Sequence, residues 1–314
     1  MLTLFGCTTI ETLYLQDVEV TGPINQSPIH ITDSTDASVT ISARFSYNPE
    51  KEIKAKTDGT PHVNEDGFYQ VDTIYHNDGT ISYKKNSRAN SYPYRGQNLT
   101  WKFATVTAGL DFDFKLSRNF ALFVGVNYAG GNNKSLWGGT GGLGVFGVKN
   151  GMAFRLDAGF HFQSIAYDAH TIAEKKETNF WGSSYEYVMF YHDIDETTYF
   201  DPFVNFTFNT AKRDWLLNIF INGGYSVQSL LDFEPNSIDY DWFFLPPFVF
   251  NTTYTTDFRG ETTAGFLHFT PGVYFNFAEQ GRILIGARFF YETQLEEVTQ
   301  NLFILPMMQV DFSL

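Results

Sequence analysis

The residues best suited to chemistry lie in the run YHDIDETTYF, over residues 191–200. His192 stands beside Asp193 and close to Asp195. A histidine next to carboxylates can act as a general base or bind a metal ion. The same composition is typical of a solvated acidic loop, and we favour that interpretation. The candidates for catalysis are therefore His192, Asp193 and Asp195. For the chain as a whole, we favour a non-enzymatic role. We identify no metal site and no cofactor motif.

Two further runs resemble motifs of known enzymes, but the sequence around them does not support a catalytic or nucleotide-binding role. The run GYSVQ, residues 224–228, lacks the second glycine of a G-x-S-x-G nucleophile elbow. The run GTGGLG, residues 139–144, satisfies G-x-G-x-x-G, but no helix is predicted after it and no βαβ unit surrounds it. Glycines inside a predicted strand more often mark bends or close packing. Neither serine catalysis nor dinucleotide binding is predicted.

A second group of ionisable residues lies inside apolar segments. In GMAFRLDAGFHFQ, residues 151–163, apolar residues alternate with Arg155, Asp157 and His161. A period of two predicts a β-strand with two different faces. The same parity places a set of ionisable side chains on one interior face, and we expect them to form a paired polar network because unpaired buried charges are costly. This predicted lumen network consists of Arg44, Asp111, Asp113, Arg155, Asp157, His161, His268 and Arg288.

The elements that would position these residues are strands. Alternating segments recur along the chain, at residues 37–47, 99–116, 120–129, 140–149, 152–163, 200–209, 215–228, 265–277, 282–292 and 301–314. Aromatic residues make up 18% of the chain, and yet the mean hydropathy is −0.21. No window approaches the roughly 20 apolar residues of a transmembrane helix. We predict an all-β chain of about ten strands, with eight or twelve as alternatives.

Short and long connections alternate between these segments. Turns near 117–119, 150–151, 210–214 and 278–281 are short, whereas loops near 48–98, 168–198 and 229–262 are long. This layout resembles the outer-membrane β-barrel superfamily of Gram-negative bacteria over residues 37–314. The resemblance implies a transmembrane antiparallel up-and-down β-barrel in the cell outer membrane, surrounded by its lipid, with short periplasmic turns and long extracellular loops. A soluble β-sandwich would expose a face rich in Lys, Glu and Thr, but the polar face here is rich in Gly, Asn, Ser and Asp.

The two ends of the chain carry short signals. The run MQVDFSL, residues 308–314, resembles the terminal strand signal that the barrel-assembly machinery reads, with Leu314 in place of the usual Phe. That resemblance implies the assembly machinery as a partner. The run LFGC resembles a bacterial lipobox, which implies lipidation of Cys7, the single cysteine. We therefore divide the chain into a residual signal segment, 1–7, a periplasmic tether, 8–36, and the barrel, 37–314.

The long loops suggest where the chain meets other molecules. They are acidic and carry aromatic residues, which are typical of a contact surface for a ligand or partner that the sequence does not identify: Trp181, Tyr185, Tyr187, Trp242 and Phe243. Residues 68–85 predict a hairpin that turns at residues 77–79. The net charge of −14 argues against nucleic-acid binding.

We predict a structural or surface-binding role for this chain. A narrow pore or transporter for small or hydrophobic solutes is the first alternative. An outer-membrane hydrolase is the second, because the run around His192 is similar to omptin proteases, which are barrels that use His and Asp near the extracellular rim. No second Asp pair is found in a matching position.

Overall fold

The computed structural model describes residues 7–32, 38–49, 52–55, 68–69, 71–75, 81–85, 91–92, 98–131, 134–178, 184–212, 217–233, 244–245, 248–249, 260–277, 280–295 and 297–314. Side chains are described over 18–32, 38–49, 52–55, 99–131, 134–170, 194–212, 217–231, 262–277, 280–295 and 297–314. Among these residues, no helix has the length and apolar character needed to cross a membrane.

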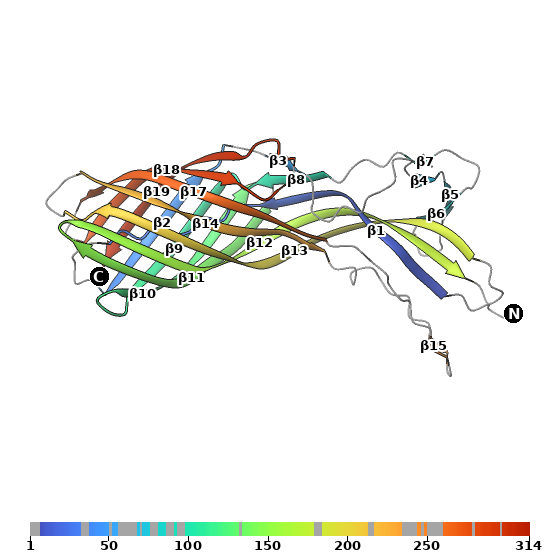
Figure 1. Ribbon diagram of the computed structural model, residues 1–314, viewed down its shortest axis with the longest axis horizontal. Coiled ribbons are helices and arrows are strands. Elements are labelled where there is room, and N and C mark those ends of the chain that lie inside the picture. Colours follow the sequence, from blue (N-terminus) through green and yellow to red (C-terminus); the bar gives the residue numbers. More distant parts are fainter. Residues whose placement is uncertain are drawn as a thin grey trace.

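Ten strands form a closed antiparallel barrel (Figure 1). They are β2 (Val39–Tyr47), β9 (Val106–Lys115), β10 (Phe120–Gly131), β11 (Lys134–Lys149), β12 (Met152–Thr178), β13 (Ser184–Thr210), β14 (Leu217–Phe233), β17 (Gly260–Asn276), β18 (Gly281–Glu292) and β19 (Leu302–Ser313). Each strand pairs with its neighbour along the barrel order, and β2 pairs with β19 to close the ring. The predicted up-and-down barrel of about ten strands is confirmed.

The outer surface of the barrel carries an apolar belt. On β12, Met152, Leu156 and Phe160 are exposed, and the intervening Arg155 and Asp157 are buried inside. The apolar stretch of about ten residues on this strand matches the length of a transmembrane β-strand. Because the wall is closed, its backbone N–H and C=O groups pair between strands, as a hydrocarbon solvent requires. The alternation of apolar and polar residues in the sequence therefore corresponds to side chains that point alternately toward the lipid and toward the barrel interior.

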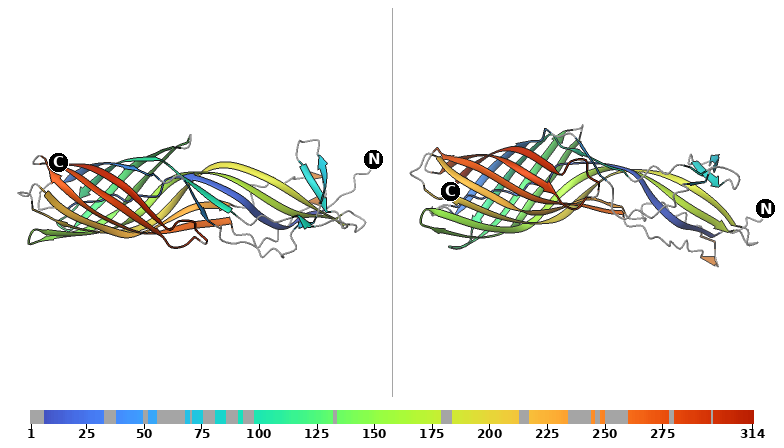
Figure 2. Two further views of the ribbon diagram at one scale, coloured as in Figure 1. Left: turned by 90° about the horizontal axis from the view of Figure 1, so that it is seen from above. Right: turned by 45° about the horizontal axis from the view of Figure 1, so that its top comes forward.

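Tight hairpins gather at one end of the barrel. The β11–β12 hairpin turns at Asn150 and Gly151, whose φ angles are 52° and 75°. Positive φ at both central residues is the geometry of a type I′ turn, which Asn-Gly favours. The C-terminus lies at the same end (Figure 2), where the Ser38 N–H donates to the Leu314 carbonyl at 2.9 Å. Short turns mark the periplasmic end of outer-membrane barrels.

At the opposite end, β12 and β13 continue together well beyond the other strands (Figure 1). Each is 27 residues long, and their pairing extends to Thr178 and Ser184. β1 (Cys7–Gly22) adds to β12, while β6 (Ile81–Lys85) and β5 (Val71–Tyr75) add to β13. We call this extension the blade. The expected loop at 168–198 is thus largely paired strand, and the expected hairpin over 68–85 is confirmed by the β5–β6 pairing, although its turn lies outside the described residues.

A small lid sheet closes the mouth of the barrel beside the blade. β8 (Asn98–Phe103) pairs in parallel with β1, and β3 (Glu52–Ala55) pairs with β8. An apolar core joins this lid to the inner barrel wall, and it includes Val20, Ile53, Leu99, Trp101, Phe103, Ile165, Leu230, Phe266, Phe290, Phe303 and Leu305. The remaining short strands form two separate pairs: β4 (Phe68–Tyr69) with β7 (Ser91–Tyr92), and β15 (Phe244–Leu245) with β16 (Phe248–Val249).

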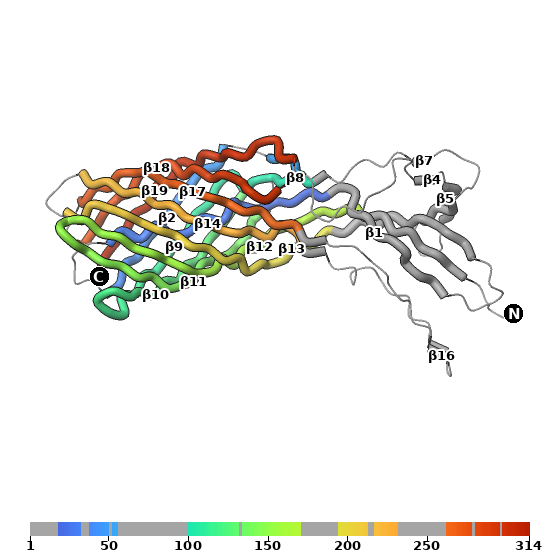
Figure 3. The backbone as a smooth tube through the Cα atoms, viewed as in Figure 1, coloured from blue at the N-terminus to red at the C-terminus, as the bar shows by residue number. Residues whose placement is uncertain are grey.

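The segment expected to be a periplasmic tether is placed differently. Residues 7–22 form β1, which pairs with β12 on the blade side, and residues 23–32 lie buried among side chains of the barrel interior. Figure 3 follows residues 18–32 from the mouth into the barrel. Residues 33–37 lie outside the described part. The division at residue 36 therefore needs correction, because polar side chains of the lumen pair with this polar segment and give it a buried position.

Candidate functional site: the occupied lumen

The barrel lumen is occupied by residues 23–32, PINQSPIHIT, which we call the luminal segment. The segment has no regular secondary structure, and nine of its ten residues are buried, with Gln26 partly exposed. A buried backbone outside a sheet must find partners other than a neighbouring strand. The barrel wall supplies those partners from several directions.

Side chains of the wall bond to the backbone of the luminal segment. The Gln228 side chain accepts from the Asn25 N–H at 2.9 Å and donates to the Pro23 carbonyl at 2.7 Å. Further along, Gln309 donates to the Ile29 carbonyl at 2.7 Å, and Asn209 donates to the Thr32 carbonyl at 2.9 Å. These donors belong to β14, β19 and β13. The wall thus replaces the ladder bonds that the segment lacks.

Side chains of the segment also bond to the wall. The Asn25 amide donates to Asp201 on β13 at 3.2 Å. The Ser27 hydroxyl lies 3.1 Å from Nε2 of His161, and His30 Nδ1 lies 3.1 Å from an Asp157 oxygen, both on β12. On the other side of the lumen, Gln26 donates to Ser46 at 2.7 Å and to Thr107 at 3.1 Å. The contacts reach β2, β9, β12 and β13, so the segment is fixed from opposite walls.

Ion pairs of the wall surround the luminal segment. Arg44 on β2 contacts Asp111 on β9 at 2.5 Å. Arg155 binds both Asp113 oxygens, at 2.7 and 2.8 Å, and also Asp157 at 2.7 Å. Nearer the tight hairpins, Arg282 on β18 pairs with Asp311 on β19 at 2.9 Å. Removal of one partner of a buried pair typically costs about 3–5 kcal/mol, because it leaves an uncompensated charge.

Among the residues whose side chains are described, two members of the predicted network keep a buried nitrogen without a hydrogen-bond partner. The Arg288 guanidinium is fully buried, with a 3.8 Å contact from Nη2 to the Met307 sulfur and no partner at Nε. His268 is buried, and its Nδ1 has no partner. The other six predicted members all belong to the ion pairs or hydrogen bonds above. All eight side chains lie in the barrel interior.

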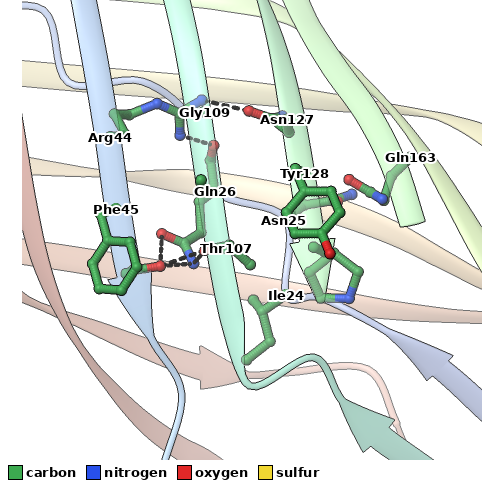
Figure 4. A pocket seen from close by; sticks show the side chains of 14 residues that line it. Ile24, Asn25, Gln26, Arg44, Phe45, Thr107, Gly109, Asn127, Tyr128 and Gln163 are labelled. Atoms are coloured by element: carbon green, nitrogen blue, oxygen red, sulfur yellow. Dashed lines mark hydrogen bonds between the residues drawn. The ribbon is translucent and has the colours of Figure 1, made fainter. Parts of the chain in front are cut away.

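A small cavity remains between the luminal segment and the wall (Figure 4). Gln26, Arg44, Asn127 and Gln163 line it, and Figure 4 shows Arg44 bonded to Asn127 and to the Gln26 backbone. Its volume of ≈ 30 Å³ is enough to hold water. The guanidinium of Arg44 is engaged by Asp111, Asn127 and the Gln26 carbonyl, so it is already satisfied.

The catalytic candidates lie in the blade. His192 and Asp193 are part of β13 and pair along the backbone with His170 and Ala169 of β12, while their side chains lie outside the described part. Asp195 is exposed to solvent. No group of three or more His, Cys, Asp or Glu residues that could hold a metal ion occurs in the described residues. The catalytic role of this run stays a prediction.

Of the residues predicted for surface contact and lipidation, Tyr185, Tyr187 and Cys7 lie on the loop side. Tyr185 and Tyr187 belong to the blade part of β13, and Trp181, Trp242 and Phe243 lie outside the described residues. Cys7 begins β1 and pairs along the backbone with Thr178 near the end of the blade. The sequence did not predict Asn25, Ser27 and His30 as interior residues. Asn25 and Ser27 lie in a polar run between Pro23 and Pro28, His30 follows the second proline, and the segment has no sustained strand period.

A closed antiparallel wall, an apolar belt outside and a polar interior together define a transmembrane β-barrel of the bacterial outer-membrane type. No family model matches the chain, and no curated protein matches it. Among solved structures, the chain is similar to the outer membrane protease OmpT of Escherichia coli, at 7% identity and a TM-score of 0.40, with 91% of this chain and 99% of that chain covered. It is also similar to the CymD monoaromatic hydrocarbon channel, at 6% identity and a TM-score of 0.29, with 89% of each chain covered. OprB of Pseudomonas putida aligns at 9% identity with a TM-score of 0.24, over 89% of this chain and 94% of that chain.

Proposed function

We propose that this barrel is a non-conducting membrane anchor that holds a surface-binding structure, the lid and the blade, outside the cell. The observation that carries the proposal is the luminal segment, which is bonded to opposite walls of the barrel. An open pore needs a continuous aqueous path, whereas this interior is filled by a part of the same chain. The aromatic and acidic residues of the long connections are the proposed contact surface for a ligand or partner.

The apolar lid core supports the same proposal. Trp101 and Phe103 of β8 are buried against Phe266 of β17, at ring distances of 5.9 Å for Trp101–Phe266 and 4.8 Å for Trp101–Phe103. Apolar packing across a barrel mouth excludes water, and polar solutes would have to cross it. The lid and the luminal segment thus close the barrel at two successive levels. This favours an anchor over the alternative of a narrow pore.

Conductance in planar lipid bilayers tests the proposal. We expect the full chain to give no steady single-channel current. A variant with residues 24–31 replaced by a Gly-Ser linker of equal length should conduct intermittently, because a linker without these side chains cannot bond to the wall. As a matched control, Gln300→Ala changes a partly exposed residue on the loop side, outside the lumen, and should stay silent. Steady current through the full chain would instead support the pore alternative.

A further inference from the structure

We infer that this barrel carries its own N-terminal strand out through its lumen and displays it on the cell surface. The proposal concerns β1 and whatever is attached before it. It does not rest on the binding role above, because it follows from the path of the chain. The observations are the direction of the luminal segment, the closed wall around it and the pairing of β1 with the blade.

The luminal segment runs from the mouth to the hairpin end. Gly22, just before it, accepts hydrogen bonds from Trp101 Nε1 at 3.2 Å and from the Ala104 N–H at 3.2 Å, both next to the lid. Thr32, at its other end, bonds to Asn209, whose backbone partner is Ala153. Ala153 lies two residues after Gly151, the second residue of the tight turn. The segment therefore spans the barrel lengthwise.

The number of membrane crossings fixes the side of β1. The ten wall strands make ten crossings, and the luminal segment adds one, which gives eleven in total. An odd number of crossings places β1 and Leu314 on opposite sides of the membrane. Leu314 lies at the end with the tight hairpins, which is periplasmic in barrels of this type. β1 is then extracellular.

The closed wall surrounds the luminal segment on all sides. The segment therefore cannot reach its position by packing against the finished barrel from the side. Every wall strand is hydrogen-bonded to two neighbours, and β2 and β19 close the ring. The chain therefore has to enter the lumen before or during closure, or be threaded afterwards. Once outside, β1 is held by an antiparallel ladder with β12 from Cys7 to Thr21 and by a parallel ladder with β8. These ladders and the luminal bonds retain the displayed strand.

Cysteine labelling in intact cells tests the location of β1. In a Cys7→Ser background, which removes the single native cysteine, Glu19→Cys puts a thiol on β1 at a half-exposed position. Ser135→Cys marks the loop side and Ser117→Cys marks the turn between β9 and β10, both at exposed positions. The reagent is a PEG-maleimide that is too large to pass porins. We expect Glu19→Cys and Ser135→Cys to react in intact cells, and Ser117→Cys to react only after the outer membrane is permeabilised.

A cysteine crosslink in the lumen tests the path itself. In the same background, a short bis-maleimide should join the pair Asn25→Cys with Asp201→Cys, because Nδ2 of Asn25 lies 3.2 Å from an Asp201 oxygen in the native protein. The pair Ser46→Cys with Thr107→Cys, on adjacent wall strands, is the positive control. The pair Asn25→Cys with Asp311→Cys should not crosslink, because Asp311 lies near the hairpin end. Labelling of Glu19→Cys only in permeabilised cells, or no luminal crosslink when the wall pair crosslinks, would overturn the inference.

Discussion

At the residue scale, small residues make room for the buried ion pairs. Gly125 on β10 faces the Arg44–Asp111 pair, and a Cβ at this position would lie 2.0 Å from an Asp111 oxygen and 3.0 Å from the Leu110 carbonyl. Asp111 cannot move freely, because it also accepts from Thr140 at 3.1 Å. Gly141 on β11 is different, since its nearest neighbour to a Cβ would be 3.9 Å away. At Gly125 the packing leaves no space for a Cβ, whereas at Gly141 it does. A comparison of the two positions therefore shows the effect of packing apart from the general effect of replacing a glycine in a strand.

We therefore expect Gly125→Ala to lower the free energy of unfolding by about 1–3 kcal/mol, the usual cost of overpacking. Gly141→Ala should stay within about 0.5 kcal/mol, as is usual where no contact is disturbed. Urea unfolding in lipid vesicles, followed by the gel mobility of unheated samples, measures both. Equal effects of the two substitutions would contradict a role of Gly125 in seating the ion pair.

At the scale of elements, the lid and the barrel are separate layers that share one apolar core. Trp101 is the largest fully buried side chain of the lid, whereas its neighbour Lys102 is half-exposed and pairs with Glu19 at 2.5 Å. Truncation of a buried tryptophan to alanine typically costs about 3–5 kcal/mol. An exposed ion pair contributes at most about 1 kcal/mol. Besides this core, the ladder of β8 with β1 and the bonds between Lys54 and Thr299, at 2.9 and 3.2 Å, hold the lid. None of these involves a strand of the wall, so we expect the lid to lose the stability.

We expect Trp101→Ala to expose residues 98–103 to proteolysis by at least tenfold, while the heat-induced mobility shift of the barrel stays unchanged. The tenfold figure is a lower bound, because a loss of about 1.4 kcal/mol already changes an opening equilibrium tenfold. Lys102→Ala serves as the control and should leave cleavage near that of the unchanged chain. If Trp101→Ala unfolded the barrel together with the lid, the two layers would be one cooperative unit.

At the scale of the whole molecule, hydrocarbon is the solvent of the outer face. The exposed residues of β12 run from Met152 near the tight turn to Phe162 near the mouth, with Leu156 close to the middle. A charge on the lipid face of a barrel costs about 2–4 kcal/mol at the midplane and about 0–1 kcal/mol near the interfaces. The cost of a charge should therefore depend on its depth along the strand.

We expect Leu156→Arg to lower the free energy of unfolding in vesicles by about 2–4 kcal/mol, and Phe162→Arg by about 1 kcal/mol or less. Both residues are exposed, with relative accessibilities of 48% and 36%, so burial by protein does not explain a difference. Parallel urea titrations of the two variants measure the contrast. A chain whose outer face met water would show small, equal effects at both positions.

The sequence predicted the wall well because its signal is local. In residues 152–163, an apolar residue that faces lipid alternates with a residue that faces the interior. The odd or even position along the strand was therefore enough to predict that Arg155, Asp157 and His161 lie inside. The Asn150–Gly151 turn was likewise readable, because a type I′ turn depends on two adjacent residues. Partners within the wall were not readable in the same way: nothing in the spacing indicates that Arg155 reaches Asp113, which is 42 residues away.

By itself, the sequence determined the barrel, its lipid-facing belt and its polar interior. In each strand, apolar residues that face lipid alternate with residues that face the interior, and this period of two can be seen in the sequence. Only the tertiary structure decided what fills that interior. Residues 23–32 have no period, and their partners lie far along the chain: His161 is 134 residues from Ser27, and Gln309 is 280 residues from Ile29. A polar run of this kind pairs with water when it is isolated. Inside the closed wall, fixed side chains take the place of that water, and the run is a buried segment that connects the barrel to β1 beside the blade.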